Sequence, residues 1–457
     1  MGKTLAEKIL SAKCGEDARA GDIVVAQVDV AAFQDGTGPL GVRQLQKMNL
    51  EKVKAPYSIL FIDHAAPSPR KELSNDHILL RTFAQKTGAI LSDVGDGVIH
   101  QRLVEDFAKP GDVVIGADSH SCTSGALGAF ATGMGSTDVA IGMAMGKTWF
   151  KVPETFRVEA TGTFQPGVFS KDLILYLIGM LGADGATYKA LEFGGPTIDT
   201  MSMESRFTLS NMAVEAGAKT GLIASDKITK AYLQSRGRLK EWRPLTPDKD
   251  AQYERVIKID AGKIVPQVAF PHTVDNTKPI DQTKGIKIDQ VFIGTCTNGR
   301  IEDLKIAAKI LKGKKRAPHS RLIVCPASRD VYLDAIKLGL LEIFVRAGAS
   351  IMGPGCGACV GVHEGILGDK EVCLSSANRN FKGRMGNPEG FIYLASPATC
   401  AYSAITGEIS DPRKIIVRGQ NKAGKGKSPD KKVRMLKFSS ASKMRENFAK
   451  AKRPKKK

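Results

Sequence analysis

Apolar residues recur along most of the chain in short runs that turn-forming residues separate. Residues 21–33 (GDIVVAQVDVAAF) form one such run with a polar break, and it ends at the turn QDG. Further strand-like runs occupy residues 55–64 (APYSILFIDH), 89–92 and 112–120 (DVVIGADSH), with helical patterns among them. Repeated units of strand, short loop and helix predict parallel α/β structure.

The pattern changes along the chain in a way that predicts three α/β domains and a tail. Residues 1–152 form the first domain, and the period-two alternation of VPETFRVEATGTFQPG then predicts a second, residues 153–278. The third, residues 279–413, opens with GIKIDQVFIGTCTNGR and an amphipathic helical pattern, IEDLKIAAKILKG. Residues 414–457 are rich in lysine and poor in aromatic residues, which predicts a disordered tail.

Length and composition exclude some classes of protein. A chain of 457 residues exceeds one ordinary core, and its 42% hydrophobic content is typical of a globular enzyme. No apolar run approaches the roughly 18 residues that a membrane span needs. The start, MGKTLAEKILSAKCG, predicts a short amphipathic helix without the features of a signal peptide. The eight cysteines are therefore interpreted as reduced thiols of a cytoplasmic protein.

The positive charge is concentrated in the tail. The net charge is +20, but residues 414–457 hold seventeen Lys or Arg and two acidic residues, which accounts for +15 of it. The rest of the chain therefore gives no electrostatic reason to bind nucleic acid. A solvated extension is the simplest interpretation of the tail, and attraction to nucleic acid, a membrane surface or an acidic partner are alternatives.

Three cysteines in glycine-rich loops are the principal candidates for metal chemistry. Cys356 and Cys359 form a C-x-x-C in GPGCGACVG, and Cys296 lies sixty positions upstream in IGTCTNGR. Glycine lets the backbone approach a bulky inorganic ligand because it has no Cβ. Strand-like apolar runs at residues 290–293 and 344–352 precede the two loops and could bring the three thiolates together.

Three candidate ligands leave several chemistries open. A closed structural zinc site takes four ligands, which Cys325 or Cys373 would complete, whereas a catalytic zinc site keeps an open position. An iron–sulfur cluster held by three cysteines has an iron that is open to substrate, unlike an electron-carrying cluster with four. A redox dithiol and inert core cysteines are also compatible with the spacing.

Polar residues at strand ends are further candidates. Asp63 and His64 end one strand and Asp118, Ser119 and His120 end another, where the chemistry of α/β sheets collects. The alternative is structural, with the aspartate capping the next helix. A serine hydrolase is disfavoured because no G-x-S-x-G elbow surrounds the serine. The segment GALGAFATGMG lacks the G-x-G-x-x-G of a dinucleotide loop.

Asn211 and Glu215 lie four positions apart in SNMAVEAGAKT, which predicts that they share one face of a helix. Such a pair is usually solvated surface, but small and apolar neighbours favour a partly buried carboxylate with a shifted pKa here.

Three motifs, GPGCGACVG, TCTNGR and ANRNFKGR, resemble those of the aconitase superfamily, in the branch of 3-isopropylmalate dehydratase and homoaconitase large subunits. The resemblance covers residues 2–413. It implies three α/β domains around a [4Fe-4S] cluster, without the swivelling fourth domain. It also implies that Cys296, Cys356 and Cys359 hold the cluster, whose fourth iron binds a hydroxy di- or tricarboxylic acid.

The resemblance also implies roles for individual residues. His64 protonates the substrate hydroxyl and Asp63 orients it. The implied catalytic residues are Asp63, His64, His100, Asp118, His120 and Glu215. The implied substrate-binding residues are Gln34, Ser119, Asn211, Arg379 and Arg384. Asn298 and Asn378 are implied neighbours of the cluster.

Two departures from the family pattern bear on substrate and partner. Gln34 matches aconitases, whereas many bacterial isopropylmalate dehydratases have His there, so citrate, homocitrate and a dimethylmalate-type substrate stand beside isopropylmalate. Single-chain aconitases carry the serine base in a Ser-Ser-Arg motif, but Ser375 and Ser376 precede Ala377 here. We therefore expect a small subunit with the serine base and the substrate-reading loop. Rival classes are a zinc hydrolase and an RNA-binding iron sensor.

Overall fold

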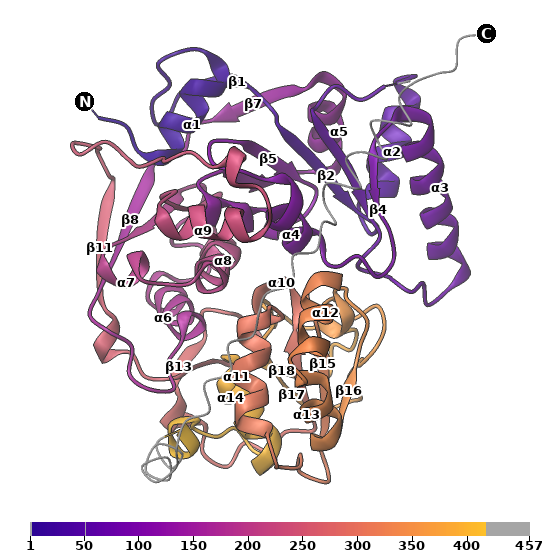
Figure 1. Ribbon diagram of the computed structural model, residues 1–457, viewed down its shortest axis with the longest axis vertical. Coiled ribbons are helices and arrows are strands. Elements are labelled where there is room, and N and C mark those ends of the chain that lie inside the picture. Colours follow the sequence, from indigo (N-terminus) through magenta and orange to yellow (C-terminus); the bar gives the residue numbers. More distant parts are fainter. Residues whose placement is uncertain (1, 51, 417–457) are drawn as a thin grey trace.

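The computed structural model describes residues 2–50 and 52–416, which fold into three α/β units in contact with one another (Figure 1). The predicted α/β class is therefore confirmed. Each unit has its own sheet, and the third lies below the other two in Figure 1. Of the predicted tail, residues 417–457 lie outside the described residues.

The first unit is built on a five-stranded parallel sheet. Its strands, in spatial order, are β4 (Ile90–Ser92), β3 (Tyr57–Phe61), β2 (Val30–Gln34), β5 (Val113–Gly116) and β6 (Phe130–Gly133). Its helices are α1 (Leu5–Cys14), α2 (Gly38–Lys47), α3 (Lys71–Thr87), α4 (Ile99–Arg102) and α5 (Ser136–Met145). Every residue of the central strand β2 is buried, as expected for a parallel strand covered on both faces.

The predicted apolar run at residues 21–33 forms two strands in two different sheets. Its first part is β1 (Ile23–Gln27), which pairs antiparallel with β7 (Lys147–Lys151), and its second part is β2. In β1 and β7 exposed and buried residues alternate, because one face of this pair is solvated. The polar break between the two parts therefore marks a change of sheet.

The second unit has a four-stranded parallel sheet. In spatial order its strands are β10 (Thr220–Ile223), β9 (Ala190–Gly194), β8 (Thr155–Thr161) and β11 (Arg255–Asp260). Its helices are α6 (Ser170–Leu181), α7 (Pro196–Asp199), α8 (Met203–Met212) and α9 (Lys227–Ser235). Asn211 lies in α8, whereas Glu215 lies in the 3₁₀ turn Ala213–Ala216, so the predicted shared helix is wrong although both side chains reach the same site.

The third unit has a seven-stranded mixed sheet. In spatial order its strands are β13 (Thr277–Pro279), β12 (Gln267–Ala269), β18 (Phe391–Leu394), β17 (Val372–Ser375), β14 (Gln290–Gly294), β15 (Arg321–Cys325) and β16 (Ala349–Ile351). Its helices are α10 (Thr295–Asn298), α11 (Ile301–Leu311), α12 (Arg329–Lys337), α13 (Leu340–Ala347) and α14 (Pro397–Thr406). The boundary predicted at residues 278/279 falls inside β13.

The strand predicted at residues 344–352 is partly wrong. Residues 344–347 are the end of α13, and only β16 is extended. Gly348, with φ of 91°, ends the helix, so the apolar run crosses from a buried helix face into an edge strand. A continuous apolar run does not by itself distinguish these two structures.

The three units meet around α10, at the centre of Figure 1. This short helix contacts α4 of the first unit and α8 of the second. One continuous apolar core contains residues from all three sheets, such as Ile59, Val158 and Phe292. A backbone bridge between Gly97 and Ser328 joins the first unit to the third. The carboxyl ends of several strands are thereby brought to one place.

Gly97 is expected to tolerate no side chain, because its φ is +127° and a Cβ would lie 2.5 Å from the Cα of Ser328. Replacing it with alanine should lower the free energy of unfolding by about 1–3 kcal/mol or more, through strain at the joint between two units. Gly95 is the matched control, since its φ is +84° but nothing lies within 4 Å of the place that an added methyl group would take. Urea unfolding gives the free energy of unfolding of G97A and G95A. Equal decreases in the two variants would contradict the steric explanation.

No helix within residues 2–50 and 52–416 combines the length and the apolarity that crossing a bilayer requires.

Candidate active site

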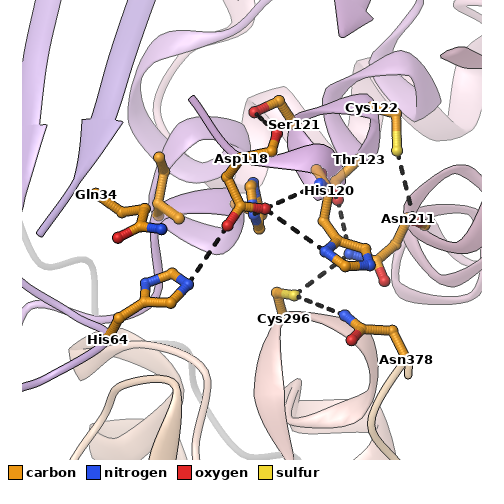
Figure 2. A network of polar contacts seen from close by, with 12 residues as sticks. Gln34, His64, Asp118, His120, Ser121, Cys122, Thr123, Asn211, Cys296 and Asn378 are labelled. Carbon is orange, nitrogen blue, oxygen red and sulfur yellow. Dashed lines mark hydrogen bonds and ion pairs between the residues drawn. The ribbon is translucent and has the colours of Figure 1, made fainter. Parts of the chain in front are cut away.

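The predicted strand-end residues meet at one edge of the first sheet. Gln34 ends β2, Asp63 and His64 follow β3 by two and three residues, and Asp118 follows β5 by two. These strands are parallel neighbours, so their carboxyl ends lie side by side. Figure 2 shows Gln34, His64 and Asp118 together, with Cys296 of the third unit opposite them.

His64 is a buried imidazole between two carboxylates. Its Nδ1 lies 3.0 Å from Asp63 Oδ1, and its Nε2 lies 3.4 Å from Asp118 Oδ2. Burial alone would lower the pKa of His64, but the charges and hydrogen bonds of Asp63 and Asp118 raise it well above its usual range. The imidazole is therefore held protonated, which suits a proton donor.

Asp118 connects three histidines. Its Oδ1 lies 2.8 Å from His100 Nε2 and accepts the backbone N–H of His120 at 2.9 Å, while Oδ2 faces His64. Burial would raise the pKa of Asp118, but these histidines hold it well below its usual range. The carboxylate therefore stays ionised and fixes the orientation of the imidazoles around it (Figure 2).

Glu215 lies between His120 and Arg379. The His120 Nε2 is 2.7 Å from Glu215 Oε1, and Arg379 Nε donates to the same carboxylate at 2.8 Å. Burial would raise the pKa of Glu215, but hydrogen bonding to His120 and the charge of Arg379 lower it. These contacts join residues from all three units into one polar network around an ionised carboxylate.

The three predicted metal-ligating cysteines lie next to this network. Cys296 is in α10, directly after β14, and Cys356 and Cys359 are in the loop after β16. All three are buried free thiols. The amide of Asn211 donates to Cys296 Sγ at 3.3 Å and that of Asn378 at 3.6 Å (Figure 2). Both asparagines therefore contact a candidate ligand directly.

The environment of Cys359 favours a thiolate. A hydrogen bond from Cys356 lowers its pKa well below the usual range, and Arg384, whose Nη2 donates to Cys359 Sγ at 3.5 Å, lowers it further against the effect of burial. Burial raises the pKa of Cys296 to about 11. Cys359 therefore favours the deprotonated form that binds metal, whereas a metal must displace the proton of Cys296.

Among the described residues, the three cysteines do not form the compact set of ligand atoms that one tetrahedral ion takes. In the described part of the chain, sets of ligand atoms within 4.8 Å of one another are formed by His100, Asp118 and His120 and by Asp35, Asp63 and His64, but not by the three cysteines. A tetrahedral zinc with bonds of about 2.3 Å brings its sulfur ligands to within about 4 Å of one another. Buried Arg384 Nε and His100 Nδ1 also lack hydrogen-bond partners among the described residues, so they are available to a ligand.

The remaining predicted residues lie at or beside the site. Gln34 Oε1 accepts the backbone N–H of Gly36. Ser119 begins the 3₁₀ turn Ser119–Leu127 and, with Asp118, lines a cavity of about 550 Å³. Asn298 instead donates to Thr208 and Asp303, which gives it a structural contact between α8 and α11.

Three residues that the sequence reasoning missed hold the proton donor in place. Asp35 accepts the backbone N–H groups of Asp63, His64 and Ala65 at 3.2, 2.8 and 2.9 Å, and His77 Nε2 lies 3.0 Å from its Oδ2. His363 Nε2 lies 3.0 Å from the His64 carbonyl oxygen. Asp35 directly follows an apolar strand, and this position in the sequence could have marked it as a candidate. No sequence pattern marks His77 or His363.

The cysteine loop is also tied to the proton donor through the backbone. The N–H of Cys356 donates to the carbonyl of Asp63 at 2.9 Å, and His363 contacts the next carbonyl. These links join the loop after β16 in the third unit to the end of β3 in the first.

Replacing Asp35 with asparagine should reduce kcat by about 10–100-fold while the metal content stays unchanged. The amide cannot accept all the N–H groups that the carboxylate accepts, so His64 shifts, and small misplacements of a catalytic group are costly. Asp76→Asn is the control, because Asp76 pairs with Arg43 at the surface. Steady-state kinetics with iron analysis measures both, and a wild-type kcat in D35N would contradict the positioning role.

Sequence comparison identifies the family. The model of the aconitase family (aconitate hydratase) matches residues 7–407. The chain belongs to the aconitase family. It is 63% identical over 417 residues to the 3-isopropylmalate dehydratase large subunit of Elusimicrobium minutum, covering 91% of this chain and 100% of that one. It is 56% identical to large subunit 2 of the same enzyme from Archaeoglobus fulgidus, with the same coverage.

A relative with another name also matches. The probable methanogen homoaconitase large subunit of Methanosarcina mazei is 51% identical over 395 residues, which cover 86% of this chain and all of that one. The predictions of the aconitase family and of an aconitase-type α/β fold are confirmed. After α14, the described residues, which end at 416, contain no further α/β unit.

Proposed function

We propose that this chain is the large subunit of a [4Fe-4S] hydro-lyase that interconverts 2- and 3-isopropylmalate by dehydration and rehydration, a step of leucine biosynthesis. Relatives with that name are 63% and 56% identical over their whole length. The structural observation that carries the proposal is a protonated His64 beside three converging cysteines and two arginines. This set of groups matches what removal of a hydroxyl next to a carboxylate needs.

The thiolates of Cys296, Cys356 and Cys359 would hold the cluster. When bound, it supplies a Lewis-acid iron for the substrate hydroxyl and a neighbouring carboxylate. The amides of Asn211 and Asn378 orient the Cys296 sulfur, since both donate to it.

His64 would donate the proton that the departing hydroxyl needs. Asp63 holds its Nδ1, which leaves Nε2 to face the substrate and Asp118. Asp118 also holds His100 and His120, so the proton donor sits beside a carboxylate that stays ionised. Rehydration would return the proton to the same nitrogen.

Arg379 and Arg384 would bind the substrate carboxylates. Arg379 is held by Glu215 through Nε alone, and Arg384 Nε makes no hydrogen bond within the described residues. A planar guanidinium with free N–H groups can bind a carboxylate through two parallel hydrogen bonds. Gln34 and Ser119, at the edge of the same site, would add polar contacts.

A base for the carbon proton is expected from a partner. The Ser376 hydroxyl accepts from the Gly294 N–H, and Ser375 accepts from the Ala377 N–H; both are fully buried. These serines are structural. We propose that a separate small subunit brings the serine base and the loop that reads the substrate side group, as the name "large subunit" of the relatives suggests.

Anaerobic reconstitution tests the proposal. The chain, loaded with iron and sulfide, should dehydrate 3-isopropylmalate only after the small subunit is added. Full turnover by the chain alone would refute the need for a partner. Turnover of homocitrate in place of isopropylmalate would favour a homoaconitase, which the Methanosarcina relative makes the second candidate. If the purified protein contained zinc and no acid-labile sulfide, that result would favour the rival class, a zinc hydrolase.

Two further expectations complete the proposal. A cytoplasmic location agrees with eight cysteines that are all free thiols. An RNA-binding role would rest on the basic tail, residues 414–457. Deleting residues 417–457 should leave hydro-lyase activity intact, because none of the site residues lies there.

A further inference from the structure

Two buried cations contact the backbone at Cys296 and just before Asn378. Lys171 in α6 is 0% exposed and Arg300, between α10 and α11, is 1% exposed. Neither makes an ion pair with a carboxylate in the part of the chain that the structure describes; their hydrogen bonds go mainly to backbone carbonyls. A buried charge without an ionic partner is rare and requires an explanation.

Lys171 holds the segment that leads to Asn378. Its Nζ donates to the carbonyls of Ser376 and Ala377 at 2.9 and 2.5 Å, across the contact between the second and third units. Asn378 follows directly and donates to Cys296 Sγ. The lysine therefore fixes the backbone from which this sulfur contact is made.

Arg300 holds the segment that carries Cys296 itself. Its guanidinium donates to the carbonyls of Cys296 and Thr297, and its Nε donates to the side chain of Gln101 at 3.0 Å. Gln101 belongs to α4 of the first unit. This arginine thus bridges the first and third units at the cysteine-bearing turn.

Cysteine sulfurs are among the ionisable groups that face these two cations. Burial lowers the pKa of Lys171 to about 8, and Cys400, Asp303, Cys359 and Cys296 act in the opposite direction. Burial also lowers the pKa of Arg300, and the charges of Asp303 and then Cys296 act in the opposite direction. Burial raises the pKa of Asp303 itself to about 7, so this acid is a weak counter-charge near neutral pH.

We propose that Lys171 and Arg300 are positioning residues whose positive charges are balanced by the cluster that Cys296, Cys356 and Cys359 bind. A cluster ligated by three thiolates is an anion, because their charge outweighs that of its core. The two cations would offset that charge. This inference rests on the proposed cofactor and goes beyond the residues that the family motifs supply.

Removing one of these charges should change the properties of the cluster. A nearby cation stabilises the reduced, more negative state, so Lys171→Met should move the cluster's midpoint potential to more negative values. Residues that support metal ligands typically contribute 10–100-fold to metal affinity. We therefore expect iron loss to a chelator to be about 10-fold faster in K171M than in wild type.

The experiment uses reconstituted full-length holoprotein. A redox titration monitored by electron paramagnetic resonance gives the midpoint potential. The absorbance of the complex between Fe²⁺ and a chelator gives the rate of iron loss. Lys171→Arg, which keeps the charge, should restore the potential. Arg238→Met is the matched control: Arg238 is also buried and donates to three backbone carbonyls, but it pairs with Glu241 away from the cysteines. It should lower stability and leave the potential unchanged.

Folded K171M with wild-type potential and iron retention would overturn the inference. If K171M fails to fold, Lys171→Gln tests the loss of charge while keeping a hydrogen-bond donor. Comparing R300M with R300K tests the same effect of charge at Arg300. Wild-type protein that takes up no iron and sulfide would instead refute the proposed cofactor. The two failures are distinguishable because only the second affects the wild type.

Discussion

Cys359→Ser is expected to abolish the cluster and reduce dehydration to background. Its sulfur is the one whose pKa is lowest, because Cys356 and Arg384 both stabilise the thiolate. Serine leaves that position without a metal-binding anion near neutral pH, and the arginine without its partner. Visible absorbance with iron and sulfide analysis measures the loss, and circular dichroism checks the fold.

Cys373→Ser is the matched control for this substitution. Cys373 is as buried as Cys359 but lies on β17, where its sulfur is 3.9 Å from the Gln290 amide. The control should retain iron, sulfide and activity. A C359S protein with a full complement of iron and sulfide would show that the C-x-x-C does not ligate the cluster through this residue.

His64→Gln is expected to lower kcat by about 10²–10⁴-fold while the cluster remains bound, because the substitution removes the proton donor and leaves the cysteines intact. His319→Gln is the control, since His319 is exposed and its Nε2 lies 3.3 Å from the Gly407 carbonyl oxygen. Single-turnover dehydration with iron analysis separates chemistry from metal loss. Loss of iron in H64Q to the same extent as activity would assign the residue a structural role instead.

The pH dependence of the wild type should follow the same histidine. Its pKa is raised, so the imidazole is protonated below that raised value and loses its proton as the pH rises through it. Dehydration should therefore persist through neutral pH and fall on the alkaline side. H64Q should lack this alkaline limb, and an unchanged profile in the variant would assign the limb to another group.

The sequence predicted those parts of the site that local patterns encode. Asp63, His64 and Asp118 were recognisable because each follows an apolar strand, and parallel strands end at a common edge. The C-x-x-C was recognisable from its spacing. Lys171 and His363 could not be recognised from the sequence, because the residues that they contact lie 205 and 299 positions away. Such contacts depend on how the three units pack, which no local pattern determines.

Errors in the secondary structure had similar causes. Asn211 and Glu215 are four apart, which suggested one helical face, but α8 ends at Met212 and the chain tightens into a 3₁₀ turn. Residues 344–352 are apolar throughout most of their length, and only the positive φ of Gly348 separates α13 from β16. In both cases the termination of a helix was decisive. For Glu215 it changed the element without moving the side chain out of the site.

The backbone links from Cys356 to Asp63 and from His363 to His64 couple the loop that carries the C-x-x-C to the peptide units that orient the imidazole. A shift of this loop would therefore displace His64 as well. Under the proposed function, loss of the cluster would then impair the Lewis acid and the Brønsted acid together, and rebuilding the loop around a new cluster would realign both.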